Sequence, residues 1–199
     1  MWRAVLFDLD GVLVDSYEAW FRTTNAIAAD LGYPAVSREA FAQGWGQGIE
    51  ADVRRFYWNH TIPEIERCLE EAYPQQLGHV KFDPRAAGLV DALRNRQVRT
   101  ALVTNTPRPL AKAILERGGL RLDVVVGGTD VPRPKPQPDI PLRACELLGV
   151  EPDLALLVGD TAFDRDAALA AGIAFAGLRF DCQRRLEQLD EVVSLVCEP

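Results

Sequence analysis

An apolar run that ends in two acidic residues opens the chain: residues 4–16 read AVLFDLDGVLVDS. The run Ala4–Leu9 is typical of a strand buried on both faces. Burying the Asp8 carboxylate at the end of such a strand costs several kcal/mol unless a partner compensates. Because side chains alternate along a strand, Asp8 and Asp10 are expected on the same side, with a cation near them. The stretch therefore predicts a charged site at the end of a buried strand.

Apolar runs of the same kind recur along the chain and alternate with helix-like stretches of ten or more residues. This alternation is typical of parallel strands joined by crossover helices. We therefore predict an α/β fold built on a doubly wound parallel sheet. Two helices are expected to begin at Asp83-Pro84 and Thr106-Pro107, where a capping residue precedes proline. The further expected strands are Val98–Val103, Val124–Val126, Leu154–Val158 and Ile173–Ala176.

Residues 16 to about 80 interrupt this alternation with four helical patterns and no convincing strand. Ser16, Ser37 and Thr61 are expected to cap three of the helices, and Thr61 forms a capping box with Glu64. The remaining helix is marked by Ile49, Val53, Phe56 and Tyr57. We therefore predict two domains, an α/β core of residues 1–15 and 81–199 and an all-helical insertion of residues 16–80.

Composition excludes several classes of function. The 199 residues carry 22 basic and 29 acidic side chains, a net charge of −7, and no basic face stands out for nucleic acid or an anionic membrane. No apolar run approaches the ~18–20 residues that cross a bilayer, and no signal peptide is evident. The four cysteines are scattered without a C-x-x-C pair, which argues against disulfides and structural zinc. We expect a cytoplasmic monomer or homodimer that binds neither nucleic acid nor membrane.

Polar side chains follow the expected strands at the edge where open parallel sheets bind ligands. Taken singly, Asp160 and Thr104 also fit helix caps, and Lys135 also fits a solvated loop residue. Their joint placement predicts one site that combines carboxylates, a hydroxyl, an amide and an ammonium. The converging residues are Asp8, Asp10, Thr104, Asn105, Lys135, Asp160 and Asp164.

Four segments resemble, in order, the motifs of the haloacid dehalogenase-like hydrolase superfamily. The joint match covers nearly the whole chain and is highly specific, although each segment alone is weak. In that family the insertion after the first motif is a mobile helical cap over the active site, which matches residues 16–80. The segments are FDLDGVLVDS (7–16), VTNTP (103–107), KPQPD (135–139) and VGD (158–160), the last followed by Asp164 and AALAAG (167–172).

This resemblance implies phosphoryl transfer through an aspartyl-phosphate. Asp8 would be the nucleophile, and Asp10 the general acid and base. Thr104 would donate its hydroxyl to a phosphoryl oxygen, and Lys135 would neutralise charge shared by Asp8 and phosphate. The implied cofactor is Mg²⁺, which prefers oxygen ligands. Its implied residues are Asp8, the backbone carbonyl of Asp10, Asp160 and, through a metal-bound water, Asp164.

Missing groups narrow the reaction within the family. Dehalogenase members lack an acidic residue at the position of Asp10, so dehalogenation is not expected. Phosphonatase and sugar phosphate mutase members use a cap lysine, and residues 1–80 contain none, so phosphonatase chemistry is not expected unless Lys81 substitutes. Hydrolysis of a small phosphomonoester, phosphoglycolate-like or a sugar phosphate, is therefore the prediction. A sugar phosphate mutase stays an alternative, since an arginine could replace that lysine.

Residues 43–53 read QGWGQGIEADV and resemble the tryptophan-and-glycine cap loop of phosphoglycolate phosphatases. Glycines there let the backbone approach a small substrate, although a plain helix–helix turn fits as well. The similarity is looser than that of the four motifs, because Thr106 stands where those enzymes usually carry lysine. The substrate-binding candidates are Gly11, Trp45, Arg54, Arg55 and Asn105, with Arg22 and His60 as further partners for an anionic tail.

Two alternatives are not enzymes. A signalling receiver domain also gathers aspartates, a threonine and a lysine on a doubly wound sheet, but it is usually shorter and has no helical insertion after the first strand. A relative that has lost catalysis would only bind phosphate esters, yet all the residues to which the resemblance assigns chemical roles are present here. An enzyme that acts on a small phosphorylated metabolite is therefore the prediction.

Overall fold

In a computed structural model, which describes residues 1–197, six parallel strands form one sheet in the order β5-β4-β1-β6-β7-β8. The connections run outward in both directions from β1, so the predicted doubly wound α/β fold is confirmed. The strands are β1 (Ala4–Phe7), β4 (Arg99–Val103), β5 (Val124–Val126), β6 (Ala155–Gly159), β7 (Ala174–Leu178) and β8 (Arg185–Leu186).

Strand β1 lies in the middle of the sheet and hydrogen-bonds to β4 on one side and β6 on the other. Its four side chains are fully buried and alternate between two apolar clusters. Val5 and Phe7 pack into one cluster, whereas Ala4 and Leu6 pack into the other. Burial on both faces explains why the strand reads as an unbroken apolar run.

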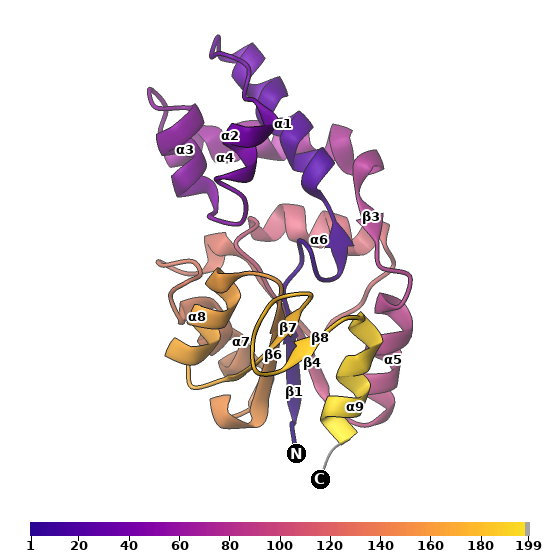
Figure 1. The fold of residues 1–199 in the computed structure, drawn as a ribbon. Helices are drawn as coiled ribbons and strands as arrows, with labels where there is room; N and C mark the ends of the chain where they lie inside the picture. Colours follow the sequence, from indigo (N-terminus) through magenta and orange to yellow (C-terminus); the bar gives the residue numbers. More distant parts are fainter. Residues whose placement is uncertain (198–199) are drawn as a thin grey trace.

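Helices cover both faces of this sheet (Figure 1). The apolar faces of α5, α6 and α9 join the cluster of Val5 and Phe7, and those of α7 and α8 join the cluster of Ala4 and Leu6. The core helices are α5 (Ala86–Asn95), α6 (Arg108–Arg117), α7 (Asp139–Leu148), α8 (Ala162–Ala170) and α9 (Val192–Cys197), with 3₁₀ turns η2 (Gly128–Asp130), η3 (Pro152–Leu154) and η4 (Leu189–Glu191).

The four helices expected between residues 16 and 80 are present and gather beyond the carboxyl end of β1 (Figure 1). The chain leaves and re-enters the core through a short antiparallel pair, β2 (Val14–Asp15) and β3 (Lys81–Phe82). We call the helical segment between them the cap. It comprises α1 (Tyr17–Asp30), α2 (Arg38–Ala42), α3 (Ile49–Phe56), α4 (Ile62–Ala72) and the 3₁₀ segment η1 (Tyr73–His79).

Two of the expected helix caps are confirmed. The Ser37 hydroxyl accepts from the N–H of Ala40, and the Glu64 carboxylate accepts from the N–H of Thr61 at 2.7 Å. The Ser16 prediction is wrong, because its hydroxyl donates to the Asp10 carboxylate instead of capping α1.

The two helices expected to start at Pro84 and Pro107 are present, but they begin two residues and one residue later than predicted. Helix α5 begins at Ala86, and the Asp83 carboxylate accepts from the N–H of Arg85 in the preceding turn. Helix α6 begins at Arg108. None of the described helices combines the length and apolarity needed to span a membrane.

Candidate active site

The ends of β1, β4 and β6 bring the predicted polar residues together at one edge of the sheet. Asp8 follows β1, Thr104 follows β4 and Asp160 follows β6. Asp8 and Thr104 are almost fully buried. The neighbouring parallel strands therefore supply a carboxylate, a hydroxyl and a second carboxylate to one small volume, as the sequence predicts.

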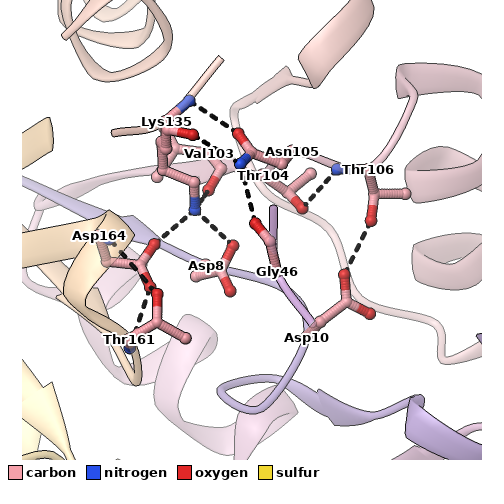
Figure 2. A network of polar contacts seen from close by, with 10 residues as sticks. All are labelled: Asp8, Asp10, Gly46, Val103, Thr104, Asn105, Thr106, Lys135, Thr161 and Asp164. Atoms are coloured by element: carbon pink, nitrogen blue, oxygen red, sulfur yellow. Dashed lines mark hydrogen bonds and ion pairs between the residues drawn. The ribbon is translucent and has the colours of Figure 1, made fainter. Parts of the chain in front are cut away.

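Lys135 is the cationic centre of the site (Figure 2). Its ammonium donates to Asp8 Oδ1 at 2.7 Å, to Asp164 Oδ1 at 2.5 Å and to the carbonyl of Val103 at 2.9 Å. Burial alone would lower the pKa of Lys135, but the charges of Asp164 and Asp8 outweigh burial and raise it. The side chain therefore stays charged.

Asn105 fixes the loop that carries Lys135. Its Oδ1 accepts from the N–H of Lys135 at 2.8 Å, and its Nδ2 donates to the carbonyl of the same residue at 2.9 Å. The same Nδ2 lies 3.1 Å from the carbonyl of Gly46 in the cap. Asn105, predicted as a substrate-binding residue, thus positions Lys135 and ties the core to the cap loop.

Three carboxylates surround the single ammonium. One oxygen each of Asp8, Asp160 and Asp164 lies within 4.8 Å of the others. Burial raises the pKa of Asp8 despite Lys135, and burial together with the Asp164 charge raises that of Asp160 to about 7. Oδ1 of Asp160 is buried without a hydrogen-bond partner among the described residues. A divalent cation with a preference for oxygen ligands, such as Mg²⁺, would satisfy both the excess charge and this oxygen.

Gly11 packs against one of these carboxylates. Its φ is +88°, and an added Cβ would lie 2.0 Å from Oδ2 of Asp160. Arg179 Nη2 holds the turn by donating to the carbonyl of Gly11 at 3.0 Å. The structure thus places this predicted substrate-binding residue behind Asp160, where only glycine fits.

Asp10 accepts hydrogen bonds from three uncharged donors. Oδ1 accepts from the Ser16 hydroxyl and from Trp20 Nε1, and Oδ2 accepts from the Thr106 hydroxyl at 2.8 Å. Burial raises the pKa of Asp10, although the three donors lower it in part. The sequence analysis did not predict any of these three donors. It noted Thr106 only because related enzymes usually carry lysine at that position.

A small cavity of about 80 Å³ lies between this site and the cap. The cap contributes the predicted Trp45, as well as Asp52, which sequence reasoning missed. Arg54 and Arg55 do not line the cavity in the described structure. Arg54 pairs with Glu50 at the surface with its side chain 66% exposed, and Arg55 bonds to Ala40 and Gln43. The cavity-lining residues of the cap are Trp20, Phe41, Gly44, Trp45, Gly46, Gly48, Ile49, Asp52 and Leu69.

The further candidates for an anionic tail also have other partners. Arg22 pairs with Glu18 on the exposed face of α1. The His60 ring lies 2.8 Å from the Tyr33 hydroxyl. Neither residue lines the cavity in the part of the chain that the structure describes.

The chain is similar to known proteins over most of its length. The family described as haloacid dehalogenase-like hydrolase matches residues 5–178. A phosphoglycolate phosphatase of Cupriavidus necator, described as plasmid, is 40% identical over 189 residues, which cover 89% of this chain and 80% of that protein. Relatives of this kind support a phosphatase and confirm the predicted class of enzyme.

Solved structures extend the similarity to the fold. A HAD-superfamily hydrolase, subfamily IA, variant 1, from Geobacter sulfurreducens has a TM-score of 0.81 at 28% identity, covering 98% of this chain and all 100% of that chain. A mutant of CbbY from Rhodobacter sphaeroides in complex with xylulose-1,5-bisphosphate has a TM-score of 0.85 at 25% identity, covering 96% of each chain.

Proposed function

The chain belongs to the haloacid dehalogenase-like hydrolases, and from that premise we propose that it is a Mg²⁺-dependent phosphomonoester hydrolase that works through an aspartyl-phosphate on Asp8. One observation carries the proposal. Lys135 binds only Oδ1 of Asp8, and Oδ2 has no hydrogen bond within residues 1–197 while Asp8 lines the cavity. An oxygen without a protein partner at the base of a cavity is available to attack a bound phosphoryl group.

In the first step, an oxygen of Asp8 forms a bond to phosphorus and the bond from phosphorus to the leaving-group oxygen breaks. Asp10 gives its proton to that oxygen, and its raised pKa supports this role because the acid must hold a proton before transfer. The Thr104 oxygen already accepts from the N–H of Thr106 at 3.1 Å. The Thr104 hydroxyl donates to no acceptor among residues 1–197, so its proton is available to a phosphoryl oxygen.

In the second step, a water oxygen attacks the phosphorus of the aspartyl-phosphate. Asp10, now ionised, takes a proton from that water, and the bond between phosphorus and Asp8 breaks. Inorganic phosphate and the free carboxylate of Asp8 result. Lys135, held between Asp8 and Asp164, offsets the negative charge in both steps.

The residues that would hold Mg²⁺ are Asp8, Asp160 and the backbone carbonyl of Asp10, with Asp164 beside them. A bound Mg²⁺ supplies charge neutralisation for a phosphate placed next to carboxylates. The unpartnered oxygen of Asp160 supports this assignment. Asp164 also accepts from the Thr161 hydroxyl and from Lys135, which suits a residue that orients a metal-bound water.

The substrate in this proposal is a small phosphorylated metabolite, phosphoglycolate-like or a sugar phosphate, and residues 16–80 are the mobile cap that encloses it. The small cavity between cap and core supports a small leaving group. The relatives support the same class, since one is named a phosphoglycolate phosphatase and a neighbour is in complex with a bisphosphate of a pentulose.

Assays of p-nitrophenyl phosphate, phosphoglycolate and hexose phosphates test this function. We expect Mg²⁺-dependent release of phosphate, lost on addition of EDTA, and a loss of at least about 1000-fold in kcat for Asp8→Asn, whose amide keeps the size but not the nucleophile. Asp91→Asn, an exposed carboxylate on α5, is the matched control and should retain wild-type rates. A tenth of wild-type turnover in Asp8→Asn would reject the proposal.

A further inference from the structure

The cap side of the cavity is aromatic and apolar except for one charged residue. Among the described residues, the only charged group that the cap contributes to the lining is Asp52. The only cation in the lining is Lys135, and it is engaged by Asp8 and Asp164. A leaving group in this cavity therefore meets a carboxylate, aromatic rings and backbone, and no free cationic side chain from the cap.

Asp52 lies on the inward face of α3. It is three residues after Ile49, which also lines the cavity, and four residues before the buried Phe56. Glu50, two residues earlier, points outward, where its side chain is 59% exposed and pairs with Arg54. The neighbouring Arg55 turns away to the carbonyl of Ala40 and to Gln43.

No side chain or backbone group of the described residues hydrogen-bonds to the Asp52 carboxylate. Burial raises the pKa of this group to about 7, and the charge of Arg55 only partly offsets that effect. An acidic residue in the first turn of a helix is favourable through the helix dipole, but the exposed Glu50 provides the same benefit without burial. A half-buried carboxylate that lacks a hydrogen-bond partner and lines a cavity is a candidate for ligand contact.

We propose that Asp52 is a specificity-determining residue that accepts a hydrogen bond from a hydroxyl of the leaving group. Its charge favours neutral, hydroxylated phosphate esters, such as polyol or sugar phosphates, over esters whose leaving group carries a carboxylate. The inference rests on the proposed phosphatase function and selects one of its two substrate types. The rings of Trp20 and Trp45, which line the same cavity, suit the C–H faces of a polyol.

The test compares two substrates in one variant. We measure kcat/KM of the full-length enzyme with Mg²⁺ for glycerol 3-phosphate and for phosphoglycolate at pH 8, where Asp52 is ionised. In Asp52→Asn, the ratio of glycerol 3-phosphate to phosphoglycolate should fall at least about 10-fold, the size of a hydrogen bond to a charged group plus the lost repulsion. Asp52→Leu also removes the carboxylate and should lower the same ratio. It replaces Asp52→Asn in the test if the asparagine variant does not fold.

Glu50→Gln removes a negative charge from the same helix outside the cavity, and it should leave the ratio within twofold of wild type. A ratio in Asp52→Asn within twofold of wild type, or one that rises, would overturn the inference. Failure of the proposed function looks different: the wild-type enzyme would then release no phosphate from p-nitrophenyl phosphate or any other ester.

Discussion

Asp10 accepts hydrogen bonds from three uncharged donors, and two of these donors lie at the start of the cap. Ser16 precedes α1 and Trp20 lies within it, whereas Thr106 belongs to the core. The arrangement orients the carboxylate without placing a cation beside it, so burial governs its pKa. Thr106 therefore acts as a positioning residue for the acid and base of the proposed reaction.

Thr106→Val tests that role. The variant removes the hydroxyl that donates to Asp10 Oδ2, and we expect kcat to fall by about 10- to 100-fold, the effect of one hydrogen bond to a charged group, while KM changes little. Thr106→Ser keeps the hydroxyl and should restore most of kcat. Equal losses in Val and Ser variants, or a loss confined to KM, would contradict the positioning role.

The turn after β1 determines where the Asp160 carboxylate can lie. Gly11 lets the chain turn with a positive φ and leaves room for Asp160 from the neighbouring strand β6. The sequence predicted β1, β4, β5, β6 and β7 because each lies in an apolar run. It could not predict β2, β3 or β8, since each has two residues, too few for a periodic pattern.

Gly11→Ala should displace Asp160, because the new Cβ would stand 2.0 Å from its carboxylate oxygen. We expect the Mg²⁺ concentration for half-maximal activity to rise at least about 10-fold, the usual cost of disturbing a group next to a metal. Gly32→Ala is a matched control: its φ is +76°, but no atom lies within 4 Å of the added Cβ. A comparable rise in both variants would mean that backbone strain, not the displacement of Asp160, causes the effect.

Across the molecule, the sheet gathers the carboxylates, Thr104 and Lys135 of the candidate active site at one edge, and the cap lines the opposite side of the cavity. The order of the motifs predicted that the polar site residues gather at one edge, because all parallel strands end at the same edge of the sheet. It could not predict which cap side chains face the cavity. Helical periodicity groups Asp52 with Ile49 and Phe56, but it does not say which face of α3 meets the core.

We expect the free energy of unfolding to depend on pH through the titration of Asp52. Its pKa rises from 3.8 to about 7 on folding, so the folded state holds the proton to higher pH. The contribution of protonated Asp52 to the free energy of unfolding is fully present below about pH 4 and is lost as pH rises through 7. Because the side chain is half-buried, we expect the free energy of unfolding to fall by about 1–3 kcal/mol as Asp52 ionises. A pKa shift of three units would correspond to ~4 kcal/mol if solvent screened none of it.

Thermal unfolding in EDTA measures this loss. Asp52→Asn should gain Tm relative to wild type between pH 5 and pH 8, by several degrees at about 2–4 °C per kcal/mol for a domain of this size. Glu50→Gln controls for the loss of a negative charge from α3. A Tm difference between Asp52→Asn and wild type that is equal at both pH values would show that Asp52 titrates normally.

Rapid acid quenching during turnover of radiolabelled p-nitrophenyl phosphate measures whether Asp8 carries the phosphoryl group. This leaving group departs without a proton, so Asp10→Asn should still form the intermediate but hydrolyse it slowly. We predict label on the peptide that contains Asp8, transient in wild type, long-lived in Asp10→Asn and absent in Asp8→Asn. Turnover without label on that peptide, or with label on another residue, would show that Asp8 is not the nucleophile.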